Sequence, residues 1–217
     1  MDWSSLPLAA VLVAGAYLSG SIPMGVLVAR LSGGPDPRTV GSGRTGGTNA
    51  LRALGRKWAA VVVVGDVLKG AVPVLVAGWL GAGPAIEVLC ALGAVVGATW
   101  SIFLGFRGGR GVGTGVGTML VIQPLAVVLA TPVFVAVILI TRYVSLGSLV
   151  ASAAMAAWMW LLWMAANGSI SVAYPIYTAI GAGLIWLAHA DNIDRLVHGQ
   201  ERKFDLALLS GRRQGQG

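Results

Sequence analysis

The chain has 217 residues, 56% of them hydrophobic and only 11% charged, and its mean hydropathy is +0.81. A soluble domain carries about 25% charged residues, so this composition excludes soluble globular and disordered proteins. It also holds too few polar residues for an outer-membrane barrel, whose lumen face needs one at every second strand position. The composition therefore predicts an all-α, polytopic membrane protein.

Charge-poor apolar runs predict seven helical segments. The runs cover residues 6–29, 58–80, 84–106, 111–141 and 143–188. A helix rises about 1.5 Å per residue and a bilayer core is about 30 Å thick, so each of the last two runs is too long for one crossing. We expect breaks at Gln123-Pro124 and at Asn167-Gly168-Ser169, which divide each of these runs into two segments.

The basic residues predict the orientation. Fourteen of the 15 Lys and Arg residues fall in segments 30–57, 107–110, 141–147 and 191–217, and the remaining one is Lys69. If seven helices cross the membrane in turn, these four segments all lie on the same side. Basic loops stay on the cytoplasmic side of a membrane, so the N-terminus is predicted outside. Residues 191–217 are then a cytoplasmic tail of one integral-membrane domain over residues 1–217. The single Cys90 excludes a disulfide framework, and no metal or cofactor is expected.

The first inside loop has the composition of an anion-binding site. Between Gly41 and Arg52 it combines four glycines and two arginines with Ser42, Thr48 and Asn49. Glycines such as Gly43 let backbone N–H groups turn toward an anion, and arginine adds a planar, charged fork. The alternative is a flexible polar loop whose arginines only report the side of the membrane.

The second inside loop places Arg107, Gly108 and Arg110 directly before a predicted helix. Free N–H groups and the helix dipole favour an anion at that position. A basic turn against lipid headgroups is the alternative.

The two remaining inside segments carry polar side chains. Ser145 suits a helix N-cap and Ser148 follows it, whereas His189 and Asn192 come at the end of the last run. Because all four inside segments emerge on one face, we expect a single cationic site for a phosphate-bearing metabolite whose apolar tail enters from the bilayer.

Asp66 and Lys69 stand three residues apart on one face of the second run. Charges inside a membrane are costly and functional by default. They either form an ion pair that holds the helix against the basic loops or contact the substrate directly.

These residues resemble a known family over nearly the whole chain. The matching motifs are Ser19-Gly20-Ser21-Ile22-Pro23, Gly41-Ser42-Gly43 with Thr48-Asn49-Ala50-Leu51-Arg52, Asp66-x-x-Lys69-Gly70, the segment 106–112, Ser145-Leu146-Gly147-Ser148, and His189 with Asn192-Ile193. In this order they resemble the bacterial acyl-phosphate-dependent glycerol-3-phosphate acyltransferases, the PlsY family. The resemblance implies a seven-helix protein of the bacterial inner membrane with its active site facing the cytoplasm.

The resemblance also implies the reaction and its partners. Members transfer an acyl chain from acyl phosphate to the primary hydroxyl of glycerol 3-phosphate, which gives lysophosphatidic acid and phosphate. Both substrates carry phosphate, so arginines, hydroxyls and backbone donors suit them, and orientation supplies much of the rate. The lipid bilayer is the other partner, and no nucleic acid is expected. The competing hypothesis is a membrane transporter for a phosphorylated metabolite, which also needs an arginine cluster and broken helices.

Residue roles are carried over by the same resemblance. His189, Arg110 and Ser148 are the catalytic candidates. The phosphate-binding candidates are Ser42, Gly43, Thr48, Asn49, Arg52, Arg107, Gly108 and Asn192. The proton acceptor is either His189 or a substrate phosphate oxygen, and the substrate is favoured.

The chain departs from the family pattern at four positions: Arg44 replaces the usual Asn, Arg107 and Arg110 replace two Lys, and Ala98 replaces a His. His189 and Asp194 also spell the His-x4-Asp signature of a thioester-using acyltransferase superfamily. Side chains five apart on a helix diverge by roughly 140°, so Asp194 is expected to be a solvated residue.

Overall fold

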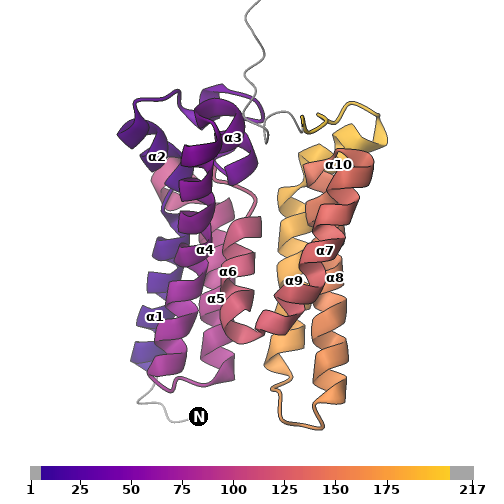
Figure 1. Cartoon of the computed structure of the whole chain (residues 1–217). Coiled ribbons are helices and arrows are strands. Elements are labelled where there is room, and N and C mark those ends of the chain that lie inside the picture. The colour runs from indigo at the N-terminus through magenta and orange to yellow at the C-terminus, as the bar shows by residue number, and fades with distance from the viewer. Residues whose placement is uncertain (1–5, 206–217) are drawn as a thin grey trace, which may run out of the picture.

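The computed structural model describes residues 6–205, which form ten α-helices, two short 3-10 helices and no strand. The long helices stand side by side, in a group of α1, α4, α5 and α6 and a group of α7, α8 and α9 (Figure 1). The helices are α1 (Leu6–Ser21), α2 (Met24–Ser32), η2 (Pro37–Thr39), α3 (Gly47–Leu54), α4 (Arg56–Trp79), α5 (Pro84–Thr99), η3 (Ile102–Leu104), α6 (Val112–Ile122), α7 (Pro124–Thr141), α8 (Val144–Ala165), α9 (Ala173–Ala188) and α10 (Ala190–Val197).

The first predicted segment is not one straight helix. It breaks between α1 and α2, which are bent by 44°. Pro23 lies at the break and has no N–H to continue the helical ladder. The Nζ of Lys69 donates to the exposed Ile22 carbonyl at 3.1 Å, and the Ser19 hydroxyl donates to the Lys69 carbonyl at 3.0 Å. The intramembrane lysine therefore stabilises the bend.

The other six predicted segments are each present as a helix. The long runs break at Gln123 and around Asn167, where the sequence placed the breaks. Among the described helices, four are long and apolar enough to cross a membrane alone, and the bent pair α1 and α2 makes a fifth when the two are counted as one span. The apolar helices α6 and α9 are shorter, so their crossing remains a prediction.

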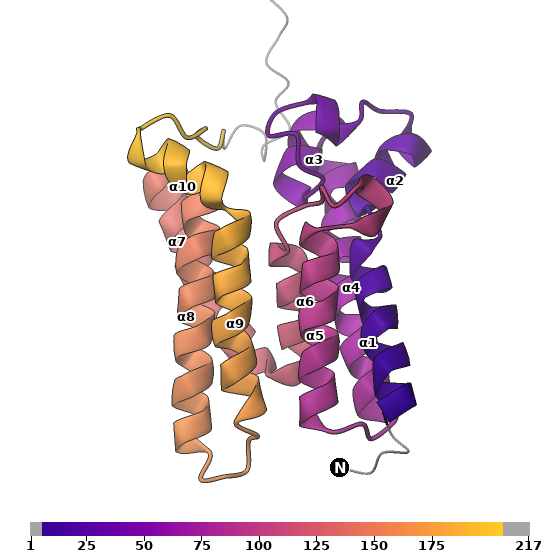
Figure 2. The same cartoon turned by 180° about the vertical axis from the view of Figure 1, so that it is seen from behind.

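Two short helices, α3 and α10, lie where the sequence predicted loop and tail. Both are at the same end of the molecule as α2, opposite the start of α1 (Figure 1), and the reverse view agrees (Figure 2). The described part of the predicted cytoplasmic tail is structured, because residues 190–197 are helical and Phe204 is buried. Residues 206–217, with Arg212 and Arg213, lie outside the described residues.

Glycines set the close contact between α4 and α6. A Cβ on Gly70 would overlap the Thr114 carbonyl, and one on Gly117 would overlap the Val67 carbonyl. Small residues let helix backbones approach in this way in membranes, where packing replaces the hydrophobic driving force. Helices α4 and α6 therefore form one rigid pair beneath the predicted anion loops.

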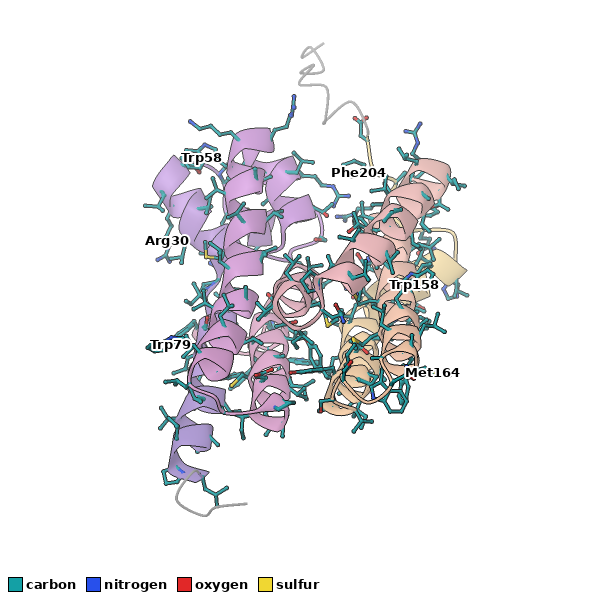
Figure 3. All side chains as sticks on the ribbon, turned by 60° about the horizontal axis from the view of Figure 1, so that its bottom comes forward. Arg30, Trp58, Trp79, Trp158, Met164 and Phe204 are labelled. Atoms are coloured by element: carbon teal, nitrogen blue, oxygen red, sulfur yellow. The ribbon has the colours of Figure 1, made fainter. Side chains whose placement is uncertain are left out.

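The lateral surface of the bundle is apolar. Trp79 is 86% exposed and Met164 is 67% exposed, and both point away from the helices (Figure 3). Aliphatic residues are exposed along the same helices, including Val11, Val64, Val128 and Leu139. A soluble protein would bury such side chains, so this surface faces lipid.

Candidate active site

A polar cavity of about 480 Å³ opens at the end of the molecule that carries α3 and α10. Residues from the four predicted inside segments line it together, along with the α4 ion pair and residues that follow α10. Six lining residues are basic and two are acidic, so the cavity is cationic: Arg44, Arg52, Lys69, Arg110, Arg195 and Arg202 against Asp66 and Glu201. The structure thus brings together Ser42, Thr48, Asn49, Arg52, Asp66, Lys69, Arg110, Ser148, His189 and Asn192.

Asn49 organises the first loop rather than offering its amide to a ligand. Its Oδ1 accepts from the Ser42 N–H at 3.0 Å, and its Nδ2 donates to the carbonyls of Pro37, Val40 and Arg44 at 2.6–3.0 Å. The side chain is 3% exposed. Both N–H donors of the Asn49 amide are thus used within the loop, and its contact with phosphate remains a prediction.

The same loop is more regular than its glycine content predicted. Helix α3 begins at Gly47, so Thr48 and Arg52 are presented from a helix, one turn apart along the cavity wall. Their backbone is therefore held by helical hydrogen bonds and is not a flexible turn.

Three predicted phosphate-binding residues, Gly43, Arg107 and Gly108, are not among the residues that line the cavity. Gly43 has φ +69° and donates its N–H to the Val40 carbonyl, and Gly108 donates its N–H to the Thr99 carbonyl at 3.0 Å. A Cβ on Gly108 would overlap the Ala98 carbonyl. Both glycines therefore shape their loops, and their N–H groups are occupied. Arg107 is exposed beside this turn.

Arg110 is the most tightly held cation of the cavity. Its Nη1 donates to the carbonyl of Ala188 at 2.6 Å. Ala188 is the last residue of α9 and precedes His189. Nη1 and Nη2 also donate to the carboxylate of Asp191 at 2.7 and 2.9 Å. This pair holds the pKa of Asp191 well below its usual range. Sequence reasoning did not single out Asp191, although its place two residues after His189, in the polar segment that follows the last apolar run, was the available signal.

The remaining arginines repel one another. Burial lowers the pKa of Arg44, and the nearby charge of Arg110 lowers it further. Burial also lowers the pKa of Arg52, and the charge of Arg202 lowers it further. Guanidinium groups stay protonated in proteins, so this cluster holds unbalanced positive charge that an anion would neutralise.

Ser145 is not a helix N-cap. Helix α8 begins at Val144 after Tyr143, and the Ser145 hydroxyl donates instead to Glu201 Oε1 at 2.8 Å. Ser148 lies one turn further on, where its hydroxyl donates to the Val144 carbonyl at 3.0 Å. A serine hydroxyl still accepts in this geometry, and it donates to a substrate after rotation about χ1.

His189 is 2% exposed and its ring orientation is fixed by its backbone. Its Nδ1 lies 2.8 Å from the Ile185 carbonyl, which only accepts, so Nδ1 carries the proton. In the neutral ring Nε2 then has the lone pair. Burial lowers the pKa of His189 to about 4, so the imidazole is neutral at physiological pH. The side chain is therefore a hydrogen-bond acceptor toward the cavity.

Glu201 completes the polar cavity from beyond α10. Its carboxylate accepts from Ser145, from the Asn192 Nδ2 at 2.7 Å and from the Arg195 Nε at 2.8 Å. Burial raises the pKa of Glu201, but these hydrogen bonds outweigh it and keep the pKa below its usual value. Glu201 lies in an irregular segment, where no periodic pattern marks it as a site residue.

The predicted ion pair between Asp66 and Lys69 is present, with 2.8 Å between Oδ1 and Nζ. Both side chains line the cavity floor, and they are 15% and 9% exposed. By contrast, Asp194 is 74% exposed on α10, where its Oδ1 lies 3.4 Å from His198 Nδ1.

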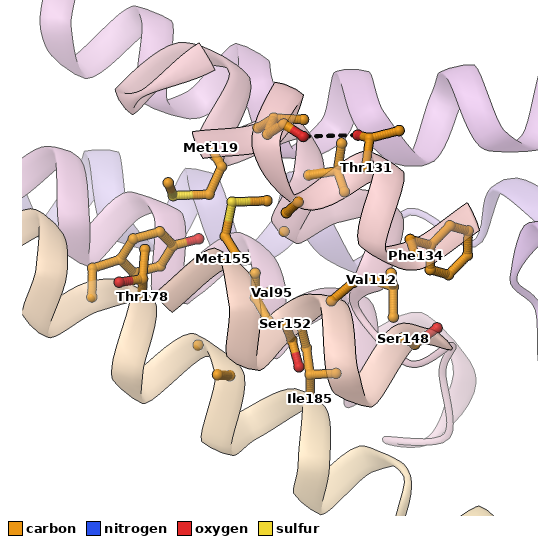
Figure 4. A pocket seen from close by; sticks show the side chains of 18 residues that line it. Val95, Val112, Met119, Thr131, Phe134, Ser148, Ser152, Met155, Thr178 and Ile185 are labelled. Atoms are coloured by element: carbon orange, nitrogen blue, oxygen red, sulfur yellow. Dashed lines mark hydrogen bonds between the residues drawn. The ribbon is translucent and has the colours of Figure 1, made fainter. Parts of the chain in front are cut away.

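A second cavity, of about 140 Å³, lies deeper between α5, α6, α7, α8 and α9. Its walls are almost wholly apolar and include Val95, Met119, Met155 and Ile185 (Figure 4). Four residues line both cavities: Val112, Val116, Phe134 and Ser148. The two spaces therefore adjoin, and Ser148 stands where the cationic space meets the apolar one.

Known proteins are similar to this chain in sequence and in fold. The family model described as glycerol-3-phosphate acyltransferase matches residues 10–199. A glycerol-3-phosphate acyltransferase of Geobacter sulfurreducens is 43% identical over 194 residues, which cover 89% of this chain and 96% of that protein. One of Thioalkalivibrio sulfidiphilus is 43% identical over 201 residues, which cover 90% of this chain and 94% of that protein.

Solved structures agree. The crystal structure of PlsY, an integral membrane glycerol 3-phosphate acyltransferase, in its glycerol 3-phosphate form superposes with a TM-score of 0.83 at 34% identity. It covers 94% of this chain and 99% of that chain. The lysophosphatidic acid form superposes with a TM-score of 0.82 at 35% identity, and the match covers 93% of this chain and 98% of that chain. The chain is thus an integral-membrane acyltransferase and belongs to the glycerol-3-phosphate acyltransferase family.

Proposed function

We propose that the protein transfers an acyl chain from acyl phosphate to the primary hydroxyl of glycerol 3-phosphate, which yields lysophosphatidic acid and inorganic phosphate. The observation that carries this proposal is the junction of the two cavities at Ser148. An acyl phosphate has an apolar tail and a charged head, and the adjoining apolar and cationic spaces match these two parts.

The acyl carbonyl carbon then lies near the junction. The chain extends among Met119, Met155 and Ile185 toward the bilayer, and the phosphate faces Arg110 and Arg52. Arginine binds phosphate oxygens in a bidentate manner, and such charge-assisted bonds are about twice as strong as neutral ones. The arginines also stabilise the phosphate as it departs, since negative charge builds up on it in the transition state.

The primary hydroxyl of glycerol 3-phosphate attacks the acyl carbon from the polar side. Its oxygen forms the new ester bond while the bond from the acyl carbon to the phosphate oxygen breaks. His189 accepts a hydrogen bond from this hydroxyl through Nε2 and orients it, because its Nδ1–H is committed to Ile185. As the ester bond forms, the hydroxyl proton turns from Nε2 to an oxygen of the departing phosphate, which takes it. No covalent enzyme intermediate is needed, because phosphate is a good leaving group.

We further propose that the protein lies in the bacterial inner membrane as one integral-membrane domain over residues 1–217, with seven crossings and the N-terminus outside. The basic residues of the four inside segments support this orientation. The cationic cavity opens at the end of the molecule formed by those segments, so the active site faces the cytoplasm.

The test uses the purified protein in detergent with palmitoyl phosphate and glycerol 3-phosphate. Equimolar lysophosphatidic acid and phosphate are the expected products, and Arg110→Ala is the matched negative control. If neither product forms, while proteoliposomes take up labelled glycerol 3-phosphate, the protein is a transporter. The cationic side chains of the cavity argue against that outcome, since its five arginines all come from segments at one end of the bundle.

A further inference from the structure

The side-chain amide of Asn192 has only one possible orientation. Its amide group lies 2.7 Å from Oε1 of Glu201, and a carboxylate accepts hydrogen bonds but does not donate them. The amide nitrogen must therefore face Glu201, and the amide oxygen must face away. Glu201 is itself fixed, because Ser145 and Arg195 donate to the same carboxylate at 2.8 Å each.

The Oδ1 atom that faces away has no partner. Asn192 is 6% exposed and lines the polar cavity, yet its Oδ1 is buried and accepts no hydrogen bond from the described residues. A buried acceptor without a donor is costly, so such a group in a cavity points to a ligand that donates. Phosphate oxygens at neutral pH chiefly accept, whereas a hydroxyl donates. The sequence expectation that Asn192 binds phosphate does not fit this orientation.

A second acceptor stands beside it. His189 and Asn192 belong to the same turn, in which the Asn192 N–H donates to the His189 carbonyl at 2.8 Å. The neutral His189 ring offers Nε2 as an acceptor, because Nδ1 donates to Ile185. One turn of chain therefore presents two neighbouring acceptors, and glycerol 3-phosphate carries two neighbouring hydroxyls.

We propose that Asn192 Oδ1 accepts a hydrogen bond from the secondary hydroxyl of glycerol 3-phosphate, and that Glu201 is the positioning residue that holds the amide in this orientation. The inference rests on the proposed function and adds the group that recognises the vicinal diol. His189 takes the primary hydroxyl, which reacts, and Asn192 takes the neighbouring one, which does not.

The segment that carries Glu201 is built to hold it. After α10 the chain turns back, and the Phe204 N–H donates to the Arg142 carbonyl at 2.6 Å. The Phe204 side chain is 8% exposed and lies between the two helix groups (Figure 3). Glu201 lies outside the residues 10–199 that the family model matches, so this anchored strap adds a carboxylate to the site from beyond that region.

The test compares glycerol 3-phosphate with 3-hydroxypropyl phosphate, which lacks only the secondary hydroxyl. In Glu201→Gln the amide oxygen faces Arg195, since a hydrogen bond from a charged donor is the stronger one. Its NH2 group then faces Asn192 and turns that amide around, which places a donor where the hydroxyl donates. We expect kcat/KM for glycerol 3-phosphate to fall roughly 10-fold or more, and that for the analogue to change less than about 2-fold.

Two companion variants make the result specific. Asn192→Ala should lose the same preference for glycerol 3-phosphate, and the double variant should lose no more than either single one, because both changes remove one interaction. Glu87→Gln is the matched control, since Glu87 is hydrogen-bonded to Tyr174 near the start of α5, at the other end of the bundle. If Glu201→Gln does not fold, Glu201→Asp is tested in its place. The aspartate side chain is shorter, so it keeps the negative charge but moves the carboxylate out of hydrogen-bond reach of Asn192.

The outcomes separate the two proposals. Equal losses for both substrates, or unchanged kinetics in a folded Glu201 variant, would overturn the role of Glu201. A wild-type protein that forms no lysophosphatidic acid would instead overturn the proposed function itself.

Discussion

The carboxylate of Asp191 holds the guanidinium of Arg110 end-on, with hydrogen bonds of 2.7 and 2.9 Å. A third bond runs from Arg110 to the Ala188 carbonyl at 2.6 Å. These three bonds use three of the five N–H groups of the guanidinium, and the others remain to bind a phosphate. Arg110 is thus a bridge between the end of α9 and the substrate, and a lysine in its place keeps the charge but loses the bidentate geometry.

Replacement of Arg110 should therefore give graded losses. Arg110→Lys keeps the charge but loses the fork, so kcat/KM should fall roughly 10- to 100-fold, the cost of one or two charge-assisted bonds. Arg110→Ala should leave almost no activity. Steady-state rates of phosphate release at varied acyl phosphate measure both variants, and Asp191→Asn serves as a milder companion. Full activity in Arg110→Lys would show that charge alone suffices.

His189 should give no acid limb near pH 6.5 in the rate profile. Because burial lowers its pKa to about 4, the imidazole is already neutral across pH 5.5 to 9. His189→Asn should raise the Michaelis constant for glycerol 3-phosphate more than it lowers kcat. Measurement of both constants across that pH range tests this expectation. If kcat instead collapses by roughly 10²–10⁴-fold and a limb near pH 6.5 vanishes, His189 is the general base.

The same histidine should make stability depend on pH. Its folded pKa lies below the unfolded value of about 6.5, so the unfolded chain binds the proton first as the pH falls. Stability is therefore lost between about pH 6.5 and pH 4, by an amount on the order of 3 kcal/mol. Asp191 and Glu201 have lowered pKa values and contribute mainly below this window. Thermal unfolding of wild type and His189→Gln across pH 4 to 8 should show a shallower acid slope in the variant.

The buried ion pair of α4 gives a prediction about stability. Lys69→Met leaves Asp66 without its partner and removes a hydrogen bond from the Ile22 carbonyl, so it should cost about 3–5 kcal/mol. The double variant Asp66→Asn with Lys69→Met removes the stranded charge and should recover most of that loss. Tryptophan fluorescence during thermal unfolding in detergent compares the three proteins. A single variant as stable as wild type would contradict this account of the bend.

Asn49 should matter for folding of the first loop more than its neighbour does. Asn49→Ala removes four hydrogen bonds that one buried amide makes within the loop, so it should cost about 2–4 kcal/mol. Thr48→Ala, one residue away on the cavity wall, should lower activity but leave the unfolding temperature nearly unchanged. Equal unfolding temperatures in the two variants would return Asn49 to the list of direct ligands.

The orientation can be tested with single cysteines in a Cys90→Ala background. Thr39→Cys lies at the end that carries α2 and α3, and Ser169→Cys lies in the turn between α8 and α9. Both positions are exposed. An impermeant maleimide should label Ser169→Cys in intact cells and Thr39→Cys only after the membrane is opened. The reverse pattern would place the N-terminus inside.

Composition and charge were enough to predict the helical class, the breaks at Gln123 and Asn167, and the gathering of four inside segments at one end. These features follow from hydropathy and from Pro or Gly punctuation, which are local. The bend at Pro23 was missed because the run around it carries no charge and has the length of a single crossing. The stabilising Lys69 comes from another helix, so no local pattern shows the connection.

The site was predicted by residue type, but the partners of those residues were not. Asn49 and Asn192 have the same side chain and similar burial, yet one is saturated by its own loop and the other keeps a free acceptor. Only the position of Glu201, nine residues after Asn192, distinguishes them. Hydrogen-bond direction depends on such tertiary neighbours, so it lies beyond what sequence patterns convey.

The adjoining cavities also determine how the products separate. Lysophosphatidic acid keeps its acyl chain in the apolar space lined by Met119 and Met155, so it passes sideways into lipid without entering water. The released phosphate leaves through the cationic opening beside Arg202 into the aqueous phase. The two products thus partition into different solvents as soon as they part. Reversal would require both products to return to the site together, one from lipid and the other from water.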